Sequence, residues 1–202
     1  MNLALIGDVH GCFNAYNEVI KTCERSIQLG DFGIGFWWGD KCTYWEPDDT
    51  SAHKFIRGNH DNPGVCQMHP GFLGDWGYLE DDGIFFISGA HSIDGAGREV
   101  GKEYWPESEE VTWKQAMDLS SSYHKVQPRI VISHDGPLNI LIQMNIWYRG
   151  GSRTVQLLDS LFDYHKPELW VFAHHHRTWS QTILGTKFIC LNELEVFDLD
   201  EY

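Results

Sequence analysis

Five short blocks rich in glycine, aspartate, asparagine and histidine punctuate this chain of 202 residues. In order they read GDVHG (7–11), GDFG (30–33), GNHD (58–61), SHDGP (133–137) and AHHHR (173–177). Each block ends a short run with strand character, and in α/β proteins ligand sites gather where strands end. The blocks therefore favour an α/β fold that brings several strand ends, with their polar side chains, to one place.

The segments between the blocks carry signals for strands, hairpins and helices. Strands are predicted over 2–7, 26–29, 129–133 and 168–173, with one hairpin about the turn at 81–83 and another about Gly185. Helices are predicted over 13–24, 107–125 and 152–164, with Glu109 and Glu110 in the first turn of the second helix. Residues 34–50 are predicted to form an aromatic loop. Because there is no internal repeat and no Pro/Ser-rich linker, a single domain is predicted over residues 1–202.

The charge balance narrows the choice of substrate. The formal net charge is −14, and no cluster of Lys or Arg stands out along the chain. Proteins that bind nucleic acid usually present a basic stripe, so a long nucleic acid is not expected as a partner. Divalent cations would offset the charge locally, which leaves a small phosphate ester as a suitable substrate.

The sequence also predicts a cytoplasmic protein. The opening MNLALIGDVHG lacks the basic region and the apolar length of a signal peptide. No apolar run approaches the roughly 18 residues of a membrane span, so no membrane partner is expected. The five cysteines are odd in number and irregularly spaced, a pattern typical of reduced thiols. The sequence carries no signal for an oligomeric state.

The side chains in the blocks point to metal chemistry. Taken singly each block is a weak signal, because a GD dipeptide is usually a turn and a lone histidine is usually not a ligand. Together they offer Asp, Asn and His side chains, a mixture that suits Mn, Fe or Zn ions and not a closed structural zinc site built from cysteines. Two such ions about 3.5–4 Å apart form a clamp for in-line displacement at phosphorus, with a shared carboxylate as the natural bridge.

The five blocks resemble the calcineurin-like metallophosphoesterases, whose pattern is D-x-H, G-D, G-N-H-[DE], a lone H, and G-H-x-H. The order agrees and the blocks span residues 7–177, so the resemblance covers nearly the whole chain. It implies an α/β fold in which two mixed β-sheets pack as a sandwich flanked by α-helices. A further segment, SGAHSID (88–94), is similar to one in small bacterial and phage members.

The resemblance also implies a role for each residue of the blocks. It implies two divalent metal ions, with Mn²⁺ favoured and Fe or Zn also suited to the ligands. The implied ligands are Asp8, His10 and His176 for the first metal, Asp31 as the bridge, and Asn59, His134 and His174 for the second.

Three further residues are implied around the substrate. His60 would face the substrate and act as the general acid, and Asp61 would orient His60 through a hydrogen bond. Arg57 precedes this block and would either contact phosphate or form a surface salt bridge; both readings stay open.

Several residues have two readings. His175 would touch the leaving group or point to solvent, and His91 would line the pocket or have no functional role. Asp94 and Arg98 are read as residues that shape a loop. The aromatic residues of 36–45 would stack a base or pack in the core.

The predicted function is a dinuclear metal-dependent phosphoesterase in which a metal-bridging hydroxide attacks phosphorus. A phosphodiesterase of small nucleotides is favoured, with 2′,3′-cyclic nucleotides among the candidates. A protein Ser/Thr phosphatase is the alternative, although the second block reads GDFGIG where that branch has G-D-x-V-D-R-G. A non-catalytic scaffold of the same fold and a DNA nuclease are weaker alternatives.

Overall fold

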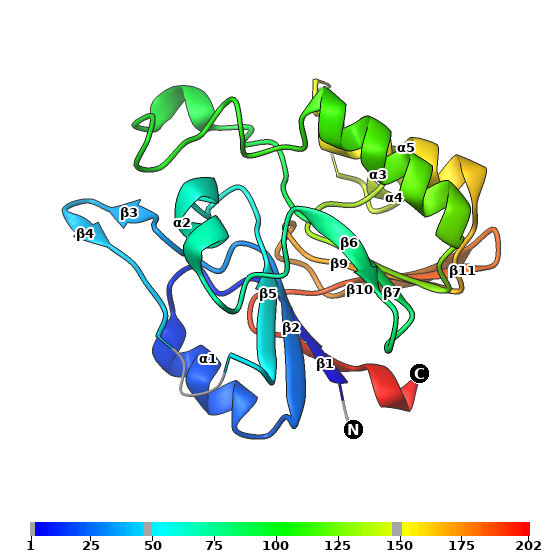
Figure 1. The fold of residues 1–202 in the computed structure, drawn as a ribbon, viewed down its shortest axis with the longest axis horizontal. Helices are drawn as coiled ribbons and strands as arrows, with labels where there is room; N and C mark the ends of the chain where they lie inside the picture. Colours follow the sequence, from blue (N-terminus) through cyan, green and yellow to red (C-terminus); the bar gives the residue numbers. More distant parts are fainter. Residues whose placement is uncertain (1–2, 47–49, 147–150) are drawn as a thin grey trace.

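Two β-sheets pack face to face at the centre of the computed structural model, which describes residues 3–46, 50–146 and 151–202 (Figure 1). In the four-stranded sheet three parallel strands are followed at one edge by an antiparallel one; its order is β12 (Val196–Asp198), β1 (Leu3–Ile6), β2 (Arg25–Leu29) and β5 (His53–Ile56). In the six-stranded sheet the inner strands are parallel and both edges antiparallel; its order is β10 (Trp179–Ile183), β11 (Thr186–Cys190), β9 (Leu169–Phe172), β8 (Ile130–Ser133), β7 (Ile84–Ile87) and β6 (Trp76–Leu79).

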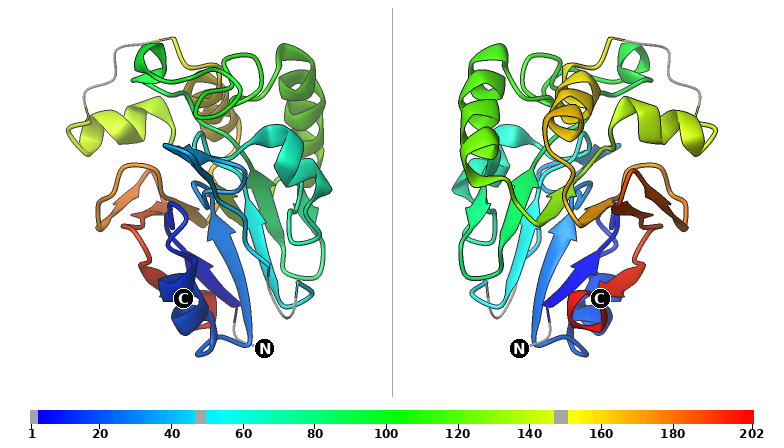
Figure 2. Two further views of the ribbon diagram at one scale, coloured as in Figure 1. Left: turned by 90° about the vertical axis from the view of Figure 1, so that its left-hand side faces the viewer. Right: turned by 90° about the vertical axis from the view of Figure 1, so that its right-hand side faces the viewer.

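Helices cover the outer faces of both sheets. The four-stranded sheet packs against α1 (Phe13–Ile20) and α2 (Pro63–Met68), and the six-stranded sheet against α3 (Trp113–Val126), α4 (Leu138–Gln143) and α5 (Arg153–Tyr164). In Figure 2 the green α3 and the golden-yellow α5 lie together, away from the blue α1. Short 3₁₀ turns occupy Gly95–Gly97 and Leu199–Glu201. No helix in the described ranges is long and apolar enough to cross a membrane.

Alternating side chains on the strands divide the core into layers. Leu5 and Ile27 point between the sheets, where they pack with residues such as Ile132 and Val171 of the facing sheet. The intervening residues point outward, so that Trp170 packs with the helical layer over the six-stranded sheet. This period of two is what an internal strand buried on both faces requires. The predicted sandwich with flanking helices is confirmed.

The predicted strands, both hairpins and the helix at 152–164 are also found, and the differences are local. Helix α3 begins at Trp113 rather than near 107, because Thr112 and Gln115 form a capping box there. Glu109 and Glu110 consequently lie ahead of the helix and are buried. Glu110 instead accepts hydrogen bonds at the start of α5, from Ser152 Oγ and the Thr154 backbone.

The predicted aromatic loop is shorter than expected. It contains the two-stranded hairpin of β3 (Trp37–Trp38) and β4 (Lys41–Cys42), and residues 47–49 lie outside the described ranges. The first predicted helix, 13–24, ends at Ile20.

Candidate metal centre

The parallel strands of both sheets end at one edge of the sandwich, and the predicted ligands follow directly. In the four-stranded sheet Asp8 follows β1, Asp31 follows β2 and Asn59 follows β5. In the six-stranded sheet His134 follows β8 and His174 follows β9. Since carboxyl ends of parallel strands meet at the same edge, side chains far apart in sequence become neighbours there.

The turns that carry these side chains have unusual backbone geometry. His10, Asp31, His174 and His176 have φ angles of 48°, 52°, 68° and 49°, in the left-handed region that residues other than glycine rarely adopt. Such conformations persist only where the surroundings enforce them, and they cluster at functional sites. Gly58 is required for a steric reason, because a Cβ atom at this position would lie 2.1 Å from Asp31 Oδ1.

Two groups of donor atoms lie side by side at this edge. The first donor group is Asp8, His10 and His176, whose ligand atoms lie within 4.8 Å of one another. His176 Nε2 is 2.9 Å from Asp8 Oδ2 and 2.9 Å from His10 Nε2. The second donor group is Asp31, His134 and His174, within the same limit.

Asp31 connects the two donor groups, because it belongs to the second and also lies near His10 of the first. Its Oδ1 is 3.2 Å from His134 Nε2, and its Oδ2 is 3.9 Å from His10 Nε2. The carboxylate is 1% exposed and also accepts a hydrogen bond from the backbone N–H of His60, at 2.7 Å. This is the position that a carboxylate bridging two cations would occupy.

The electrostatics of the cluster favour a bound cation. Burial raises the pKa of Asp8, but the neighbouring imidazoles of His10 and His176 outweigh burial and bring that pKa to about 2. Burial likewise opposes ionisation of Asp31, yet the charges of His134 and His60 hold its pKa well below the usual range. Two ionised carboxylates are thus buried close together, an arrangement that needs compensating positive charge.

The histidines of the second donor group respond to that negative charge differently. Burial lowers the pKa of His174 to about 4, so this ring is neutral and can act as a ligand at neutral pH. For His134 burial acts in the same direction, but the negative charge of Asp31 prevails and raises the pKa to about 10.

The buried atoms without partners fit a divalent metal ion. Asn59 Oδ1 and His174 Nδ1 are buried with no hydrogen-bond partner among the described residues, and the nearest polar atoms to Asp8 Oδ2 and His134 Nε2 belong to other candidate ligands. Buried polar atoms are normally paired, so a cluster of unpaired ones indicates an ion. His134 Nδ1 lies 2.7 Å from the carbonyl of Leu29, to which it can donate, and this contact leaves Nε2 free in the manner typical of ligating histidines.

His60 lies at the same edge of the sandwich as the two donor groups, but its hydrogen-bond partner differs from the predicted one. Its Nδ1 is 2.9 Å from Asp31 Oδ2, and among the described residues it forms no hydrogen bond with Asp61. Asp61 is buried and accepts four backbone N–H groups instead, those of Phe32, Gly33, Ile34 and Gly58. The prediction that Asp61 orients His60 through a hydrogen bond is therefore wrong. Asp61 ties the turn that carries Asp31 to the turn that carries Asn59.

Arg57 is also placed differently from the predicted phosphate contact. It is 2% exposed, donates from Nε to Asp75 at 2.9 Å and from Nη1 to the carbonyl of Glu109 at 2.7 Å. A guanidinium engaged in this way inside the protein does not reach a substrate, and the surface salt bridge considered as its alternative is buried instead. Arg57 is a structural residue in this conformation.

Arg98 is the arginine at the metal edge, a residue read from sequence as one that shapes a loop. A cavity of about 280 Å³ opens there, lined by Asp31, Asn59, His60, Ile93, Asp94, Arg98, His174, His175 and His176. Arg98 pairs with Asp94 through Nη2, while its buried Nη1 has no partner in the described part of the chain. The sequence shows that Arg98 follows the SGAHSID segment closely, but it does not show that the Arg98 side chain lines the cavity.

Of the two histidines with open readings, one lines this cavity. His175 Nε2 is 2.9 Å from the buried carboxylate of Asp135, a residue of the fourth block to which the sequence reading gave no role. His91 instead lies beside Glu109, at 3.4 Å, and is absent from the described lining of the cavity.

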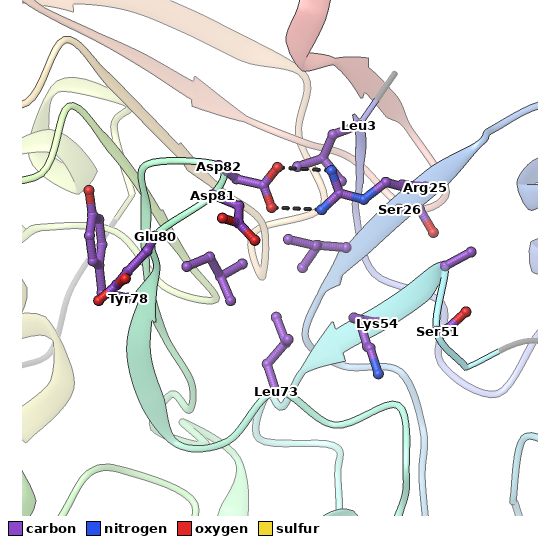
Figure 3. A pocket seen from close by; sticks show the side chains of 13 residues that line it. Leu3, Arg25, Ser26, Ser51, Lys54, Leu73, Tyr78, Glu80, Asp81 and Asp82 are labelled. Carbon is purple, nitrogen blue, oxygen red and sulfur yellow. Dashed lines mark hydrogen bonds and ion pairs between the residues drawn. The ribbon is translucent and has the colours of Figure 1, made fainter. Parts of the chain in front are cut away.

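A second cavity, of about 350 Å³, lies at the opposite ends of the strands, beside the starts of β1 and β2 (Figure 3). Figure 3 shows Arg25 and Asp82 joined across it by two hydrogen bonds, of 2.9 and 2.6 Å. Lys54 donates to the carbonyl of Pro70. Because both lining cations are engaged, the converging donors at the other edge are the better candidate for a reactive site.

Comparison with known proteins agrees with this geometry. A model of the calcineurin-like phosphoesterases matches residues 1–178. The chain belongs to the calcineurin-like phosphoesterase family. Membership implies a metallophosphoesterase, a hydrolase of phosphoric esters that uses divalent metal ions, and candidate ligands for such ions are present. No match was found among curated proteins.

Solved structures with a similar fold include GAP50, the anchor in the inner membrane complex of Plasmodium. It is 10% identical, with a TM-score of 0.52, over 95% of this chain and 71% of that one. Phosphopantetheinyl hydrolase (PptH) from Mycobacterium tuberculosis is 11% identical, with a TM-score of 0.51, over 95% of this chain and 89% of that one. At these identities the likeness concerns the fold alone.

The corrected place of Asp61 leads to a stability prediction. In Asp61→Asn an NH₂ group replaces one oxygen and faces two backbone N–H groups, each of which loses its acceptor at about 1–3 kcal/mol. We expect the free energy of unfolding, measured in urea with a chelator present, to fall by at least about 2 kcal/mol. Exposed Asp81→Asn serves as the control and should change it by less than about 0.5 kcal/mol. Unchanged stability of Asp61→Asn would contradict the structural role given to Asp61.

Proposed function

We propose that this family member is a dinuclear phosphodiesterase that hydrolyses small phosphate esters of the nucleotide type. The observation that carries the proposal is the position of Asp31, whose carboxylate lies near His134 of its own donor group and near His10 of the other. In the proposed assignment Asp8, His10 and His176 hold one ion, and Asn59, His134 and His174 hold the other. Two divalent cations, Mn²⁺ by preference, would supply Lewis acidity and a water of lowered pKa when bound.

His60 is proposed as the general acid. Its Nδ1 contacts Asp31, so Nε2 is the nitrogen left for a substrate in the cavity that His60 lines. The ring is held on its other side by Phe36, whose centroid is 5.1 Å away in an edge-on arrangement. A fixed imidazole of this kind can pass a proton to a leaving alkoxide oxygen.

Arg98 is proposed as a phosphate contact, in the role first considered for Arg57. It lines the cavity, and its guanidinium, which has several N–H donors, can donate to a phosphoryl oxygen there. Phe36 lies under the guanidinium, at 5.9 Å from its carbon to the ring centroid, and limits its movement.

The aromatic hairpin supports a nucleotide substrate at one position. Phe36 and Trp45 are 3% and 2% exposed, which makes them core residues. Trp38 is 48% exposed and lies beside the His60 ring, at 6.3 Å between centroids, where it can stack a base. The net charge of −14 opposes long nucleic acids and favours a small ester. The five free cysteines agree with the proposed cytoplasmic location.

A phosphomonoesterase of the Ser/Thr phosphatase kind is the second candidate. The second block lacks the arginine of that branch, but Arg98 brings an arginine to the cavity and so weakens this objection. A scaffold without catalysis is the third candidate, since GAP50, a protein of similar fold, is an anchor in the inner membrane complex of Plasmodium. It is disfavoured here because the whole proposed ligand set and His60 are present.

The proposal is tested first by substrate preference. The chelator-stripped protein, supplied again with Mn²⁺, is expected to hydrolyse bis-p-nitrophenyl phosphate with a higher kcat/KM than p-nitrophenyl phosphate. Cyclic 2′,3′- and 3′,5′-nucleotides are then compared. Preference for the monoester would put the second candidate first, and two bound ions with no hydrolysis of any of these esters would favour the scaffold.

His60→Ala should separate catalysis from metal binding. We expect both ions to stay bound while kcat falls about 10²–10⁴-fold on an ester with a poor leaving group. The loss should be smaller for nitrophenolate, which leaves without a proton. Asp31→Ala is the contrasting variant and should lose the two-metal loading itself. Equal losses of His60→Ala on both kinds of ester would contradict the acid role.

Arg98→Ala should weaken substrate binding. A hydrogen bond to a charged group contributes about 1.5–3 kcal/mol, so kcat/KM is expected to fall roughly 10–100-fold, with unchanged metal content. Asp94→Asn, which changes the partner of Arg98 but keeps the guanidinium, is the matched control and should lose much less. A kcat/KM of wild-type size in Arg98→Ala would remove Arg98 from the site.

A further inference from the structure

A chain of hydrogen bonds leads from the SGAHSID segment to Asn59. Asn59 Nδ2 donates to Ser92 Oγ at 3.1 Å. Ser92 donates twice to Glu109, from Oγ to Oε2 at 2.8 Å and from its backbone N–H to Oε1 at 2.9 Å. All three residues are 1–3% exposed, so water does not compete for these contacts.

The direction of the chain is set by Glu109. Both of its oxygens accept hydrogen bonds from Ser92, which is the pattern of an ionised carboxylate. Burial raises the pKa of Glu109, and the two bonds from Ser92 act in the opposite direction. A serine hydroxyl has one proton, and here it goes to Glu109. Ser92 Oγ can therefore only accept from its other neighbour, the Asn59 amide.

This direction matters because an asparagine side chain has two nearly isosteric orientations. Turning the amide by 180° exchanges the oxygen and the nitrogen without changing its shape. Only the oxygen can bind a cation, since the NH₂ group carries two protons and no available acceptor. Asn59 Oδ1 is buried and has no partner among the described residues. The next residue, His60, donates its backbone N–H to Asp31 of the second donor group.

We propose that Ser92 and Glu109 are positioning residues that hold the Asn59 amide with its oxygen toward the second donor group. The inference rests on the proposed function, because it takes Asn59 as a metal ligand. It also gives Arg57 a purpose, since Nη1 of that buried side chain holds the backbone carbonyl of Glu109. None of the three residues needs to touch an ion or a substrate.

A single substitution should reverse the direction of the hydrogen bonds between Asn59, Ser92 and residue 109 rather than only remove them. In Glu109→Gln the Ser92 backbone N–H can still only donate, so the amide oxygen takes its place opposite that group. The NH₂ group then faces Ser92 Oγ and donates to it. The serine proton is displaced toward Asn59, whose oxygen turns to accept it, and the Asn59 NH₂ group faces the second donor group.

The experiment measures Mn²⁺ affinity by calorimetry on the metal-stripped full chain. Wild type is expected to bind two ions. Ser92→Ala releases the Asn59 amide, and affinity at the weaker site should fall about 10–100-fold, the usual effect of losing a partner behind a ligand. Glu109→Gln should lower Mn²⁺ affinity at this site further than Ser92→Ala does. The double variant combines Ser92→Ala with Glu109→Gln. It has no serine hydroxyl that could donate to the Asn59 oxygen and reverse the amide, so Mn²⁺ affinity should recover to the level of Ser92→Ala alone.

Ser88→Ala is the matched control for unfolding. Ser88 is a fully buried serine of the same segment, and it bonds to the Arg57 backbone and the Gly74 carbonyl instead of Asn59. It should lower thermal stability without changing Mn²⁺ affinity. Thermal melting in chelator reports the folded fraction of every variant.

The outcomes separate this inference from the proposed function. Two ions bound by Ser92→Ala and Glu109→Gln with wild-type affinity would overturn the hydrogen-bond chain and leave the metal centre intact. A double variant weaker than Glu109→Gln would also overturn it, because simple additive damage predicts that order. A wild type that binds fewer than two ions would overturn the dinuclear function and this inference with it.

Discussion

Two buried carboxylates, Asp8 and Asp31, set the terms for the rest of the structure. Neither is exposed by more than 1%, and both stay ionised because their surroundings compensate the charge. The compensation comes from both sheets: the His174 backbone N–H and His176 contact Asp8, and His60 and His134 contact Asp31. Removing one partner from such a set leaves an uncompensated buried charge. The face-to-face packing of the sheets and the charge of the candidate metal ligands are therefore parts of one electrostatic balance.

The turns that deliver these groups are held by a third carboxylate that does not line the cavity. Asp61 accepts four backbone N–H groups from the turns after β2 and β5. Asp31 keeps its positive φ of 52° within this arrangement, although the conformation is unfavourable in isolation. In a site built on strand ends, the rigid strands set the position of each side chain and backbone hydrogen bonds set its direction.

The clustering of the candidate ligands could be predicted from sequence, whereas the direction of several neighbouring side chains could not. The blocks mark where strands end, and parallel pairing then brings Asp8 and Asp31 together. Arg57 stood directly before such a block, but its guanidinium turns inward to Asp75, which is 18 residues away along the chain. Arg98 turns into the cavity. Partners this distant leave no local trace, and neither does the role of Glu110, which accepts hydrogen bonds at the start of a helix remote in sequence.

The SGAHSID segment and the following Arg98, whose chemical role the sequence did not indicate, lie between a proposed metal ligand and the cavity. Ser92 is buried and bonded to Asn59, while Ile93, Asp94 and Arg98 line the cavity. One short stretch of chain thus contacts a proposed metal ligand on one side and the space for substrate on the other. Only a few residues of backbone separate Arg98 from Ser92. Relatives that differ in this segment should therefore differ in metal affinity and in substrate preference together, because the same backbone positions both sets of groups.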